Sequence, residues 1–131
     1  MHRILQPEGW AKPLGYANGV SATGRTIFVG GQIGWNRHSL FESDDLVAQI
    51  RQTLANIAEV LACDGGKPED VTSMTWYLID RREFLARSPE VGKVYREVMG
   101  RHFPAMAVVQ VSALIEERAK VEIQATAVVA A

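Results

Sequence analysis

The chain has 131 residues, of which 47% are hydrophobic and 22% charged, proportions typical of one globular domain spanning residues 1–131. Its formal net charge is −1, and this balance argues against a nucleic-acid partner, because a protein that follows a phosphate backbone carries a basic excess. No apolar stretch approaches the ~20 residues of a membrane span, which argues against a membrane partner.

The N-terminal part of the sequence predicts a short hairpin and no targeting segment. Pro7 and Glu8 interrupt the apolar core that a signal peptide would need, so we expect a cytoplasmic protein. Residues 16–33 contain a short strand, a turn at Gly24 and a β-branched and aromatic run over residues 26–29. We therefore expect the two strands of this segment to pair with each other.

An amphipathic helix is predicted after a loop over residues 34–42. Apolar residues recur at helical spacing over about four turns and share one face. They are Leu46, Ile50, Leu54, Ile57, Ala58 and Leu61. Ser43 or Asp44 can cap the start of this helix, and the glycines after Asp64 end it.

The segment VTSMTWYLID, residues 71–80, has the composition of a strand with apolar groups on both faces. One face carries Thr72, Met74, Trp76 and Leu78. The other carries Val71, Ser73, Thr75, Tyr77 and Ile79. Two helices can cover only one face of such a sheet, so we expect a second copy of the chain to cover the other.

The last third of the chain predicts a second helix and two closing strands. The helix is placed at Pro89–Met99, with Ser88 as its N-cap and Gly100 as its stop. The stretch from Phe103 to Ala130 contains two strands joined by a charged turn, and we expect them to be adjacent. The element order is ββαβαββ, an α+β sandwich with two helices on one face of a mostly antiparallel sheet.

Four stretches, in order and at matching spacing, resemble the RidA (YjgF) family of small imine and enamine deaminases. They are PLGYANGV, IFVGGQIGWN, QIRQTLANIAEVLACDGGKPEDV, and the run from WYLIDRREF to FPAMAVVQVSAL. The resemblance covers nearly the whole chain and implies a chorismate-mutase-like fold. It also implies a homotrimer that binds a small-molecule ligand in three clefts between subunits. Members with deaminase activity hydrolyse 2-imino or 2-enamino acids to 2-keto acids and ammonia, and we expect no cofactor.

The resemblance assigns three site residues by position. Glu122 matches a glutamate on the last strand of the family pattern, which we expect to serve catalysis. Tyr16 matches a tyrosine from the N-terminal stretch, and Gly31 matches the glycine that precedes Gln32. Both are expected to line the substrate cleft.

Four further cleft positions depart from the family pattern. Met106 replaces the substrate-binding arginine, and Val108 replaces a small or thiol residue. Gly92 stands in place of a helix asparagine, and Gly30 in place of a serine. Losing a guanidinium removes up to ~3 kcal/mol of charge-assisted hydrogen bonding to a carboxylate, which argues against the standard activity on 2-imino acids.

Several alternatives remain open at this level. Arg37, Arg96 or Arg101 could supply the missing cation, and no spacing argument selects among them. The protein could be a hydrolase in which Glu122 positions water or transfers a proton, or a non-catalytic trimer that binds a small apolar or aromatic metabolite. The scattered histidines predict no metal site. The near-neutral charge argues against the ribonuclease activity described for some relatives.

Overall fold

The computed structural model describes residues 2–130, whose main sheet has the strand order β3-β6-β4-β5. The strands are β3 (Arg25–Ile33), β6 (Val121–Val129), β4 (Val71–Leu78) and β5 (Ala105–Gln110). The β3–β6 and β6–β4 pairs are antiparallel, and the β4–β5 pair is parallel. The predicted α+β class with a mostly antiparallel sheet is therefore confirmed.

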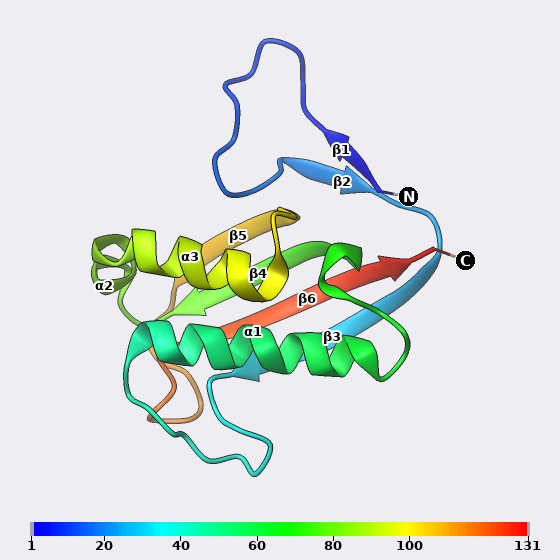
Figure 1. Cartoon of the computed structure of the whole chain (residues 1–131). Coiled ribbons are helices and arrows are strands. Elements are labelled where there is room, and N and C mark those ends of the chain that lie inside the picture. Colours follow the sequence, from blue (N-terminus) through cyan, green and yellow to red (C-terminus); the bar gives the residue numbers. More distant parts are fainter. Residues whose placement is uncertain (1, 131) are drawn as a thin grey trace.

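Two long helices cover one face of this sheet, as Figure 1 shows. They are α1 (Leu46–Ala62), which packs on β3 and β6, and α3 (Ser88–Met99), which packs beside α1. The predicted pair of helices is confirmed, and two short elements add to it. These are a 3₁₀ turn at Pro68–Asp70 and the helix α2 (Arg81–Ala86), which the sequence did not predict because six residues are too few to show a period.

The helix ends differ from the prediction by one or two residues. Asp45 caps α1, because its carboxylate accepts a hydrogen bond from the Ala48 backbone N–H at 3.0 Å. Ser43, predicted as a cap, instead accepts from the Asp45 backbone N–H at 3.0 Å. Gly100 ends α3 with a φ of 77°, as predicted.

The N-terminal hairpin prediction is wrong. Strand β2 (Gly19–Ser21) pairs antiparallel with β1 (Arg3–Leu5) in a separate two-stranded sheet, while β3 pairs with β6. Gly24 lies between β2 and β3 with a φ of 150°, and a side chain there would collide with the Val129 backbone. This close approach places β3 along β6 rather than along β2.

The two closing strands are also not adjacent, because β4 lies between β5 and β6. The chain passes from β4 through α2 and α3 to β5, and such a crossover returns the chain parallel to the strand it left. Strand β6 then pairs with the other edge of β4 and with β3. The charged turn therefore spans a strand instead of closing a hairpin.

The core lies between the helices and the sheet. The α1 side chains that share the predicted apolar face are buried there, together with Met74, Trp76 and Leu78 of β4. Val71, expected on the opposite face, is 0% exposed on the helix side, because the β4–β6 register shifts between Val71 and Ser73.

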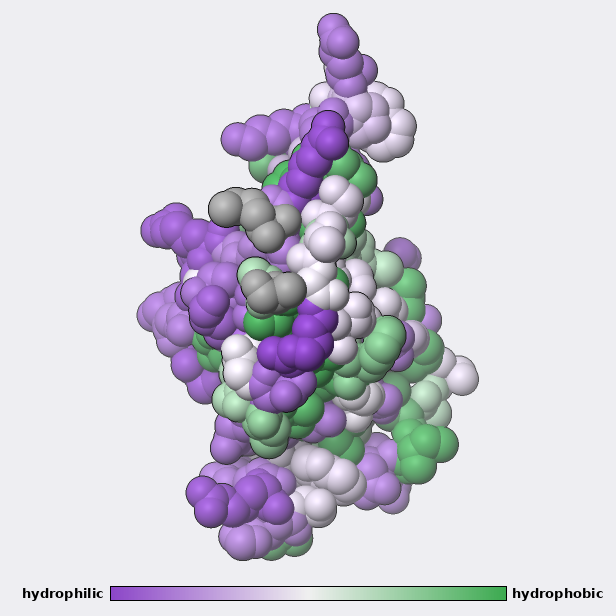
Figure 2. Space-filling model, turned by 90° about the vertical axis from the view of Figure 1, so that its right-hand side faces the viewer, coloured by the Kyte–Doolittle hydropathy of each residue, from purple (hydrophilic) through white to green (hydrophobic). Residues whose placement is uncertain are grey.

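The sheet face without helices, here called the open face, carries a mixture of polar and apolar side chains. Phe28 is 79% exposed and Val109 is 41% exposed, and Glu122 and Gln124 lie between core-facing residues of β6. In Figure 2 hydrophilic residues gather on the helix side, at the left, whereas the right-hand side shows more white and green surface. The open face thus retains apolar surface that the helices leave uncovered.

Candidate functional site

Four of the predicted site residues line one cavity of about 590 Å³, here called the aromatic cavity. It lies between the edge strand β5, helix α3 and the loop that precedes β2. The predicted residues on its wall are Tyr16, Gly92, Met106 and Val108. A cavity of this size is within the range that small-molecule sites occupy.

The strand register explains how β5 contributes to the aromatic cavity. Met106 lies opposite Met74, and Val108 opposite Trp76, so both point to the helix side of the sheet. Across the edge of β5, the Ala17 backbone N–H donates to the Pro104 carbonyl at 3.0 Å. This bond holds the neighbouring Tyr16 against the cavity.

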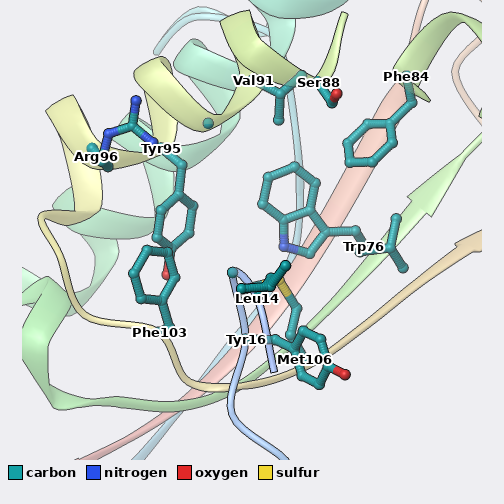
Figure 3. A pocket seen from close by; sticks show the side chains of 13 residues that line it. Leu14, Tyr16, Trp76, Phe84, Ser88, Val91, Tyr95, Arg96, Phe103 and Met106 are labelled. Atoms are coloured by element: carbon teal, nitrogen blue, oxygen red, sulfur yellow. The ribbon is translucent and has the colours of Figure 1, made fainter. Parts of the chain in front are cut away.

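Most of the remaining wall is aromatic, and the sequence pattern did not predict that these residues belong to the site. Figure 3 shows Trp76, Phe84, Tyr95 and Phe103 around the cavity. The Tyr95 and Phe103 rings stack with centroids 5.5 Å apart, and the Trp76 ring centroid lies 6.4 Å from that of Tyr95. Tyr95 belongs to the apolar stripe of α3, whose period predicted burial but not a cavity.

The Tyr95 hydroxyl stabilises the segment that follows α3. It donates a hydrogen bond to the His102 carbonyl at 2.8 Å, and His102 Nε2 lies 2.6 Å from the Val71 carbonyl oxygen. Burial raises the pKa of Tyr95 well above its ordinary value, so the hydroxyl remains protonated. Tyr95 therefore fixes the segment that carries Phe103 and is not a candidate acid or base.

The other three predicted site residues lie elsewhere, in what we call the Gly31–Glu122 site. Gly30 and Gly31 are at the β3 register shift, and Glu122 is on β6, with its side chain on the open face. A Cβ added to Gly31 would collide with the Glu122 carboxylate, whereas one on Gly30 would meet nothing within 4 Å. None of these three residues lines the aromatic cavity.

The three arginines that could replace the missing cation lie in three different hollows. Arg96 lines the aromatic cavity. Arg101 lines a neighbouring hollow that shares Tyr16 and Phe103 with it, and Arg37 lines a third one near Trp35. Only Arg96 of the three therefore faces the space beside Met106.

Within residues 2–130 there is no group of three or more His, Cys, Asp or Glu side chains placed to hold a metal ion. The helices of the same range are each too short or too polar to cross a bilayer.

The family model described as Endoribonuclease L-PSP matches residues 11–129. The chain belongs to the RidA/YjgF family. It is 33% identical over 129 residues to a RutC family protein of Pyrococcus horikoshii, covering 97% of this chain and 98% of that one. It is also 36% identical over 105 residues to the 2-iminobutanoate/2-iminopropanoate deaminase of Capra hircus, covering 79% and 73% of the two chains.

Solved structures of RidA-family proteins have the same fold. A Rid-family protein of unknown function from Yersinia pestis superposes with a TM-score of 0.86 at 30% identity, covering 98% of both chains. A YjgF-family member from Mycobacterium tuberculosis superposes with a TM-score of 0.66 at 33% identity, covering 88% of both. The predicted chorismate-mutase-like RidA architecture is thus confirmed.

Proposed function

We propose that this RidA-family protein hydrolyses the C=N bond of a small imine, or of the imine formed from an enamine. Relatives from Capra hircus and Homo sapiens, 36% and 32% identical to this chain, are named 2-iminobutanoate/2-iminopropanoate deaminases. We place the reaction in clefts where copies of the chain meet, in a homotrimer.

The observation that carries this proposal is the state of the Glu122 carboxylate. Glu122 is half-buried beside Gly31, yet no side chain within residues 2–130 forms an ion pair or hydrogen bond with it. Other acids of the chain, such as Asp45 and Glu97, are paired with arginines. A carboxylate held in place without a partner can accept a proton from water and return it.

The reaction then proceeds in two balanced steps. Water adds to the imine carbon while Glu122 accepts one of its protons and the imine nitrogen gains another. Glu122 next returns its proton to the nitrogen, the C–N bond breaks with its electron pair leaving on ammonia, and the carbon–oxygen double bond forms. The products are a ketone or 2-keto acid and ammonia.

A second copy of the chain would complete this site. Glu122 and the aromatic cavity belong to different parts of one chain, so a substrate in the cavity needs a carboxylate from a neighbour. The exposed Phe28 and Val109 on the open face support contact between copies, because burying such groups stabilises association. Sedimentation at micromolar concentration should show a trimer, and a monomer would contradict the shared site.

Hydrolysis of 2-iminopropanoate and 2-iminobutanoate, generated in situ, tests the function directly. We would compare the wild type with Glu122→Gln and Met106→Arg, measuring 2-keto acid above the spontaneous rate. A rate that depends on Glu122, in the wild type or in Met106→Arg, supports the hydrolase. Rates that Glu122→Gln leaves unchanged in both backgrounds would contradict it.

A second function is favoured by one specific observation. The aromatic cavity has mainly apolar walls, including Met106 where the family resemblance expects an arginine. A non-catalytic trimer that binds a small apolar or aromatic metabolite would suit such walls. In that case Glu122→Gln would leave ligand affinity unchanged, and no imine would be hydrolysed.

A further inference from the structure

Among residues 2–130, Arg96 of α3 is the one cationic side chain that lines the aromatic cavity. The exposed Arg96 side chain extends along the helix toward Gly92, which lies one turn earlier (Figure 3). A Cβ on Gly92 would come 3.2 Å from Arg96 Nη1, so the missing side chain at position 92 leaves room for the guanidinium. The guanidinium therefore lies beside the cavity, close to the space that a side chain at position 92 would occupy.

Arg96 is free to bind a ligand. Within residues 2–130 it forms no ion pair and no hydrogen bond through its side chain, whereas Arg87, before the same helix, pairs with Asp45 and Glu90. A guanidinium presents a planar fork of donors that matches a carboxylate through two parallel hydrogen bonds. The position of Arg96 thus offers the carboxylate-binding chemistry that Met106 lacks.

The aromatic walls set the size and character of the ligand. Trp76 makes an edge-to-face contact with Phe84, with ring centroids 6.0 Å apart, and Tyr95 and Phe103 stack nearby. Aromatic side chains arranged in this way favour a flat apolar group between or beside them. The volume of about 590 Å³ leaves room for a ring, which the methyl or ethyl group of the smallest imino acids would not fill.

One buried polar atom points to a second anchor. Trp76 is 2% exposed, and its Nε1–H has no hydrogen-bond acceptor among the residues that the structure describes. Figure 3 shows this nitrogen on the side of the indole that faces Leu14 and the Tyr95–Phe103 pair. Because buried donors are nearly always satisfied, an acceptor on a bound ligand is the natural partner of this N–H.

We propose that the aromatic cavity binds carboxylates that carry an aromatic or comparably large apolar group. Arg96 binds the carboxylate, the aromatic walls hold the ring, and the Trp76 indole N–H donates to an acceptor next to the carboxylate. The substrate class then follows from this ligand class and rests on the proposed hydrolase function. The substrates are aromatic 2-imino acids.

Isothermal titration calorimetry measures which ligands the cavity binds, and it requires no hydrolysis. The probes are 3-phenylpropanoate, its uncharged amide 3-phenylpropanamide, and propanoate, titrated into the wild type, Arg96→Met and the control Arg101→Met. We expect 3-phenylpropanoate to bind the wild type at least tenfold more tightly than either other probe. Arg96→Met should weaken it by about 10- to 100-fold, the usual effect of a charge-assisted hydrogen bond, and Arg101→Met by less than twofold.

Trp76→Phe tests the second anchor. Phenylpyruvate has a keto oxygen beside its carboxylate and 3-phenylpropanoate has none, so the variant should weaken phenylpyruvate several-fold more than it weakens 3-phenylpropanoate. A loss common to both ligands reports the altered wall, and the additional loss for phenylpyruvate reports the missing N–H donor. Equal losses for the two ligands would contradict the second anchor. Equal binding of 3-phenylpropanoate and propanoate, or an Arg96→Met variant with wild-type affinity, would overturn the proposal.

Hydrolysis rates test the ligand class and the hydrolase activity separately. The imines of phenylalanine and alanine are generated in situ, and 2-keto acid formation is followed in the wild type and Arg96→Met. Arg96-dependent binding without hydrolysis of either imine would support the ligand class and contradict the hydrolase. Glu122-dependent hydrolysis with the same KM for the phenylalanine imine in wild type and Arg96→Met would contradict the ligand class and support the hydrolase.

Discussion

The aromatic cavity and the Gly31–Glu122 site differ in how they are held. The cavity is built from the core outward, since Trp76 and Tyr95 belong both to its wall and to the buried cluster between sheet and helices. The Gly31–Glu122 site lies on the open face, where the half-buried Glu122 side chain points away from the core between β3 and β4. Stability and ligand shape are therefore coupled in the aromatic cavity, whereas the Gly31–Glu122 site can vary with little effect on folding.

Trp76→Ala should cause the largest loss in the free energy of unfolding. Removing this buried indole leaves a void in the core, and such truncations typically lower the free energy of unfolding by about 3–5 kcal/mol. Urea denaturation would measure this loss, with Glu122→Gln expected to stay within about 0.5 kcal/mol of the wild type as a surface substitution. Similar losses in both variants would show that the two regions do not differ in their effect on stability.

Gln49→Ala tests how a buried polar side chain of α1 fixes the segment that leads into β6. The buried Gln49 amide donates to the Ser43 and Arg118 carbonyls at 3.1 and 2.9 Å and accepts from the Lys120 backbone N–H at 2.8 Å. The variant leaves these groups without partners, so we expect a loss of about 1–3 kcal/mol in urea denaturation. Gln52→Ala is the matched control, because within residues 2–130 the Gln52 amide donates only to the neighbouring Asn56 side chain.

Gly31→Ala tests whether the position of the Glu122 carboxylate matters, because it moves this group without changing its chemistry. The added methyl would displace the Glu122 carboxylate, so Glu122-dependent hydrolysis should fall about tenfold or more, a loss of roughly 1.4 kcal/mol or more. Gly30→Ala, whose methyl meets nothing within 4 Å, should keep its rate. Steady-state kinetics of both variants would decide, and equal rates would show that the position of Glu122 is unimportant.

The smallest loss of stability should come from breaking an ion pair of Arg87, at the start of α3. The hydrogen bond from Arg87, followed by that from the Ala48 backbone, holds the pKa of Asp45 below its ordinary value. A lowered pKa adds stability above the unfolded value, near pH 4, and this contribution is lost as pH falls through the lowered pKa of the folded state. Asp45→Asn should therefore lower Tm slightly at pH 7, and the difference from the wild type should shrink as the solution is acidified. A difference that stays constant or grows from pH 7 down to the acid unfolding of the protein would contradict the pairing.

The sequence predicted the elements well where burial has a clear period. The apolar face of α1 and the alternation of β6, with Ile123 in the core and Glu122 on the opposite face, follow from local spacing. Pairing between distant strands does not, because the same strand chemistry fits several neighbours. The β1–β2 pair and the insertion of β4 between β5 and β6 depend on contacts far apart along the chain.

The candidate site was predicted in pieces. The family resemblance identified Tyr16 and Met106, which the structure brings to one cavity, but it could not choose among the three arginines. One signal was present in the sequence, since Gly92 and Arg96 are four residues apart and such residues are neighbours on a helix. Recognising that this pair borders a cavity required the position of α3 over the sheet.

The strand order has a consequence for biosynthesis. Strand β6 lies at the centre of the sheet, between β3 and β4, although both of these leave the ribosome before it. Until β6 emerges, the nascent chain exposes the apolar side of α1 together with two strand edges that later pair with β6. Such species are prone to aggregate, and pairing over long sequence separations is slow. Chaperones that shield nascent chains should therefore act on this protein until its central strand has been translated.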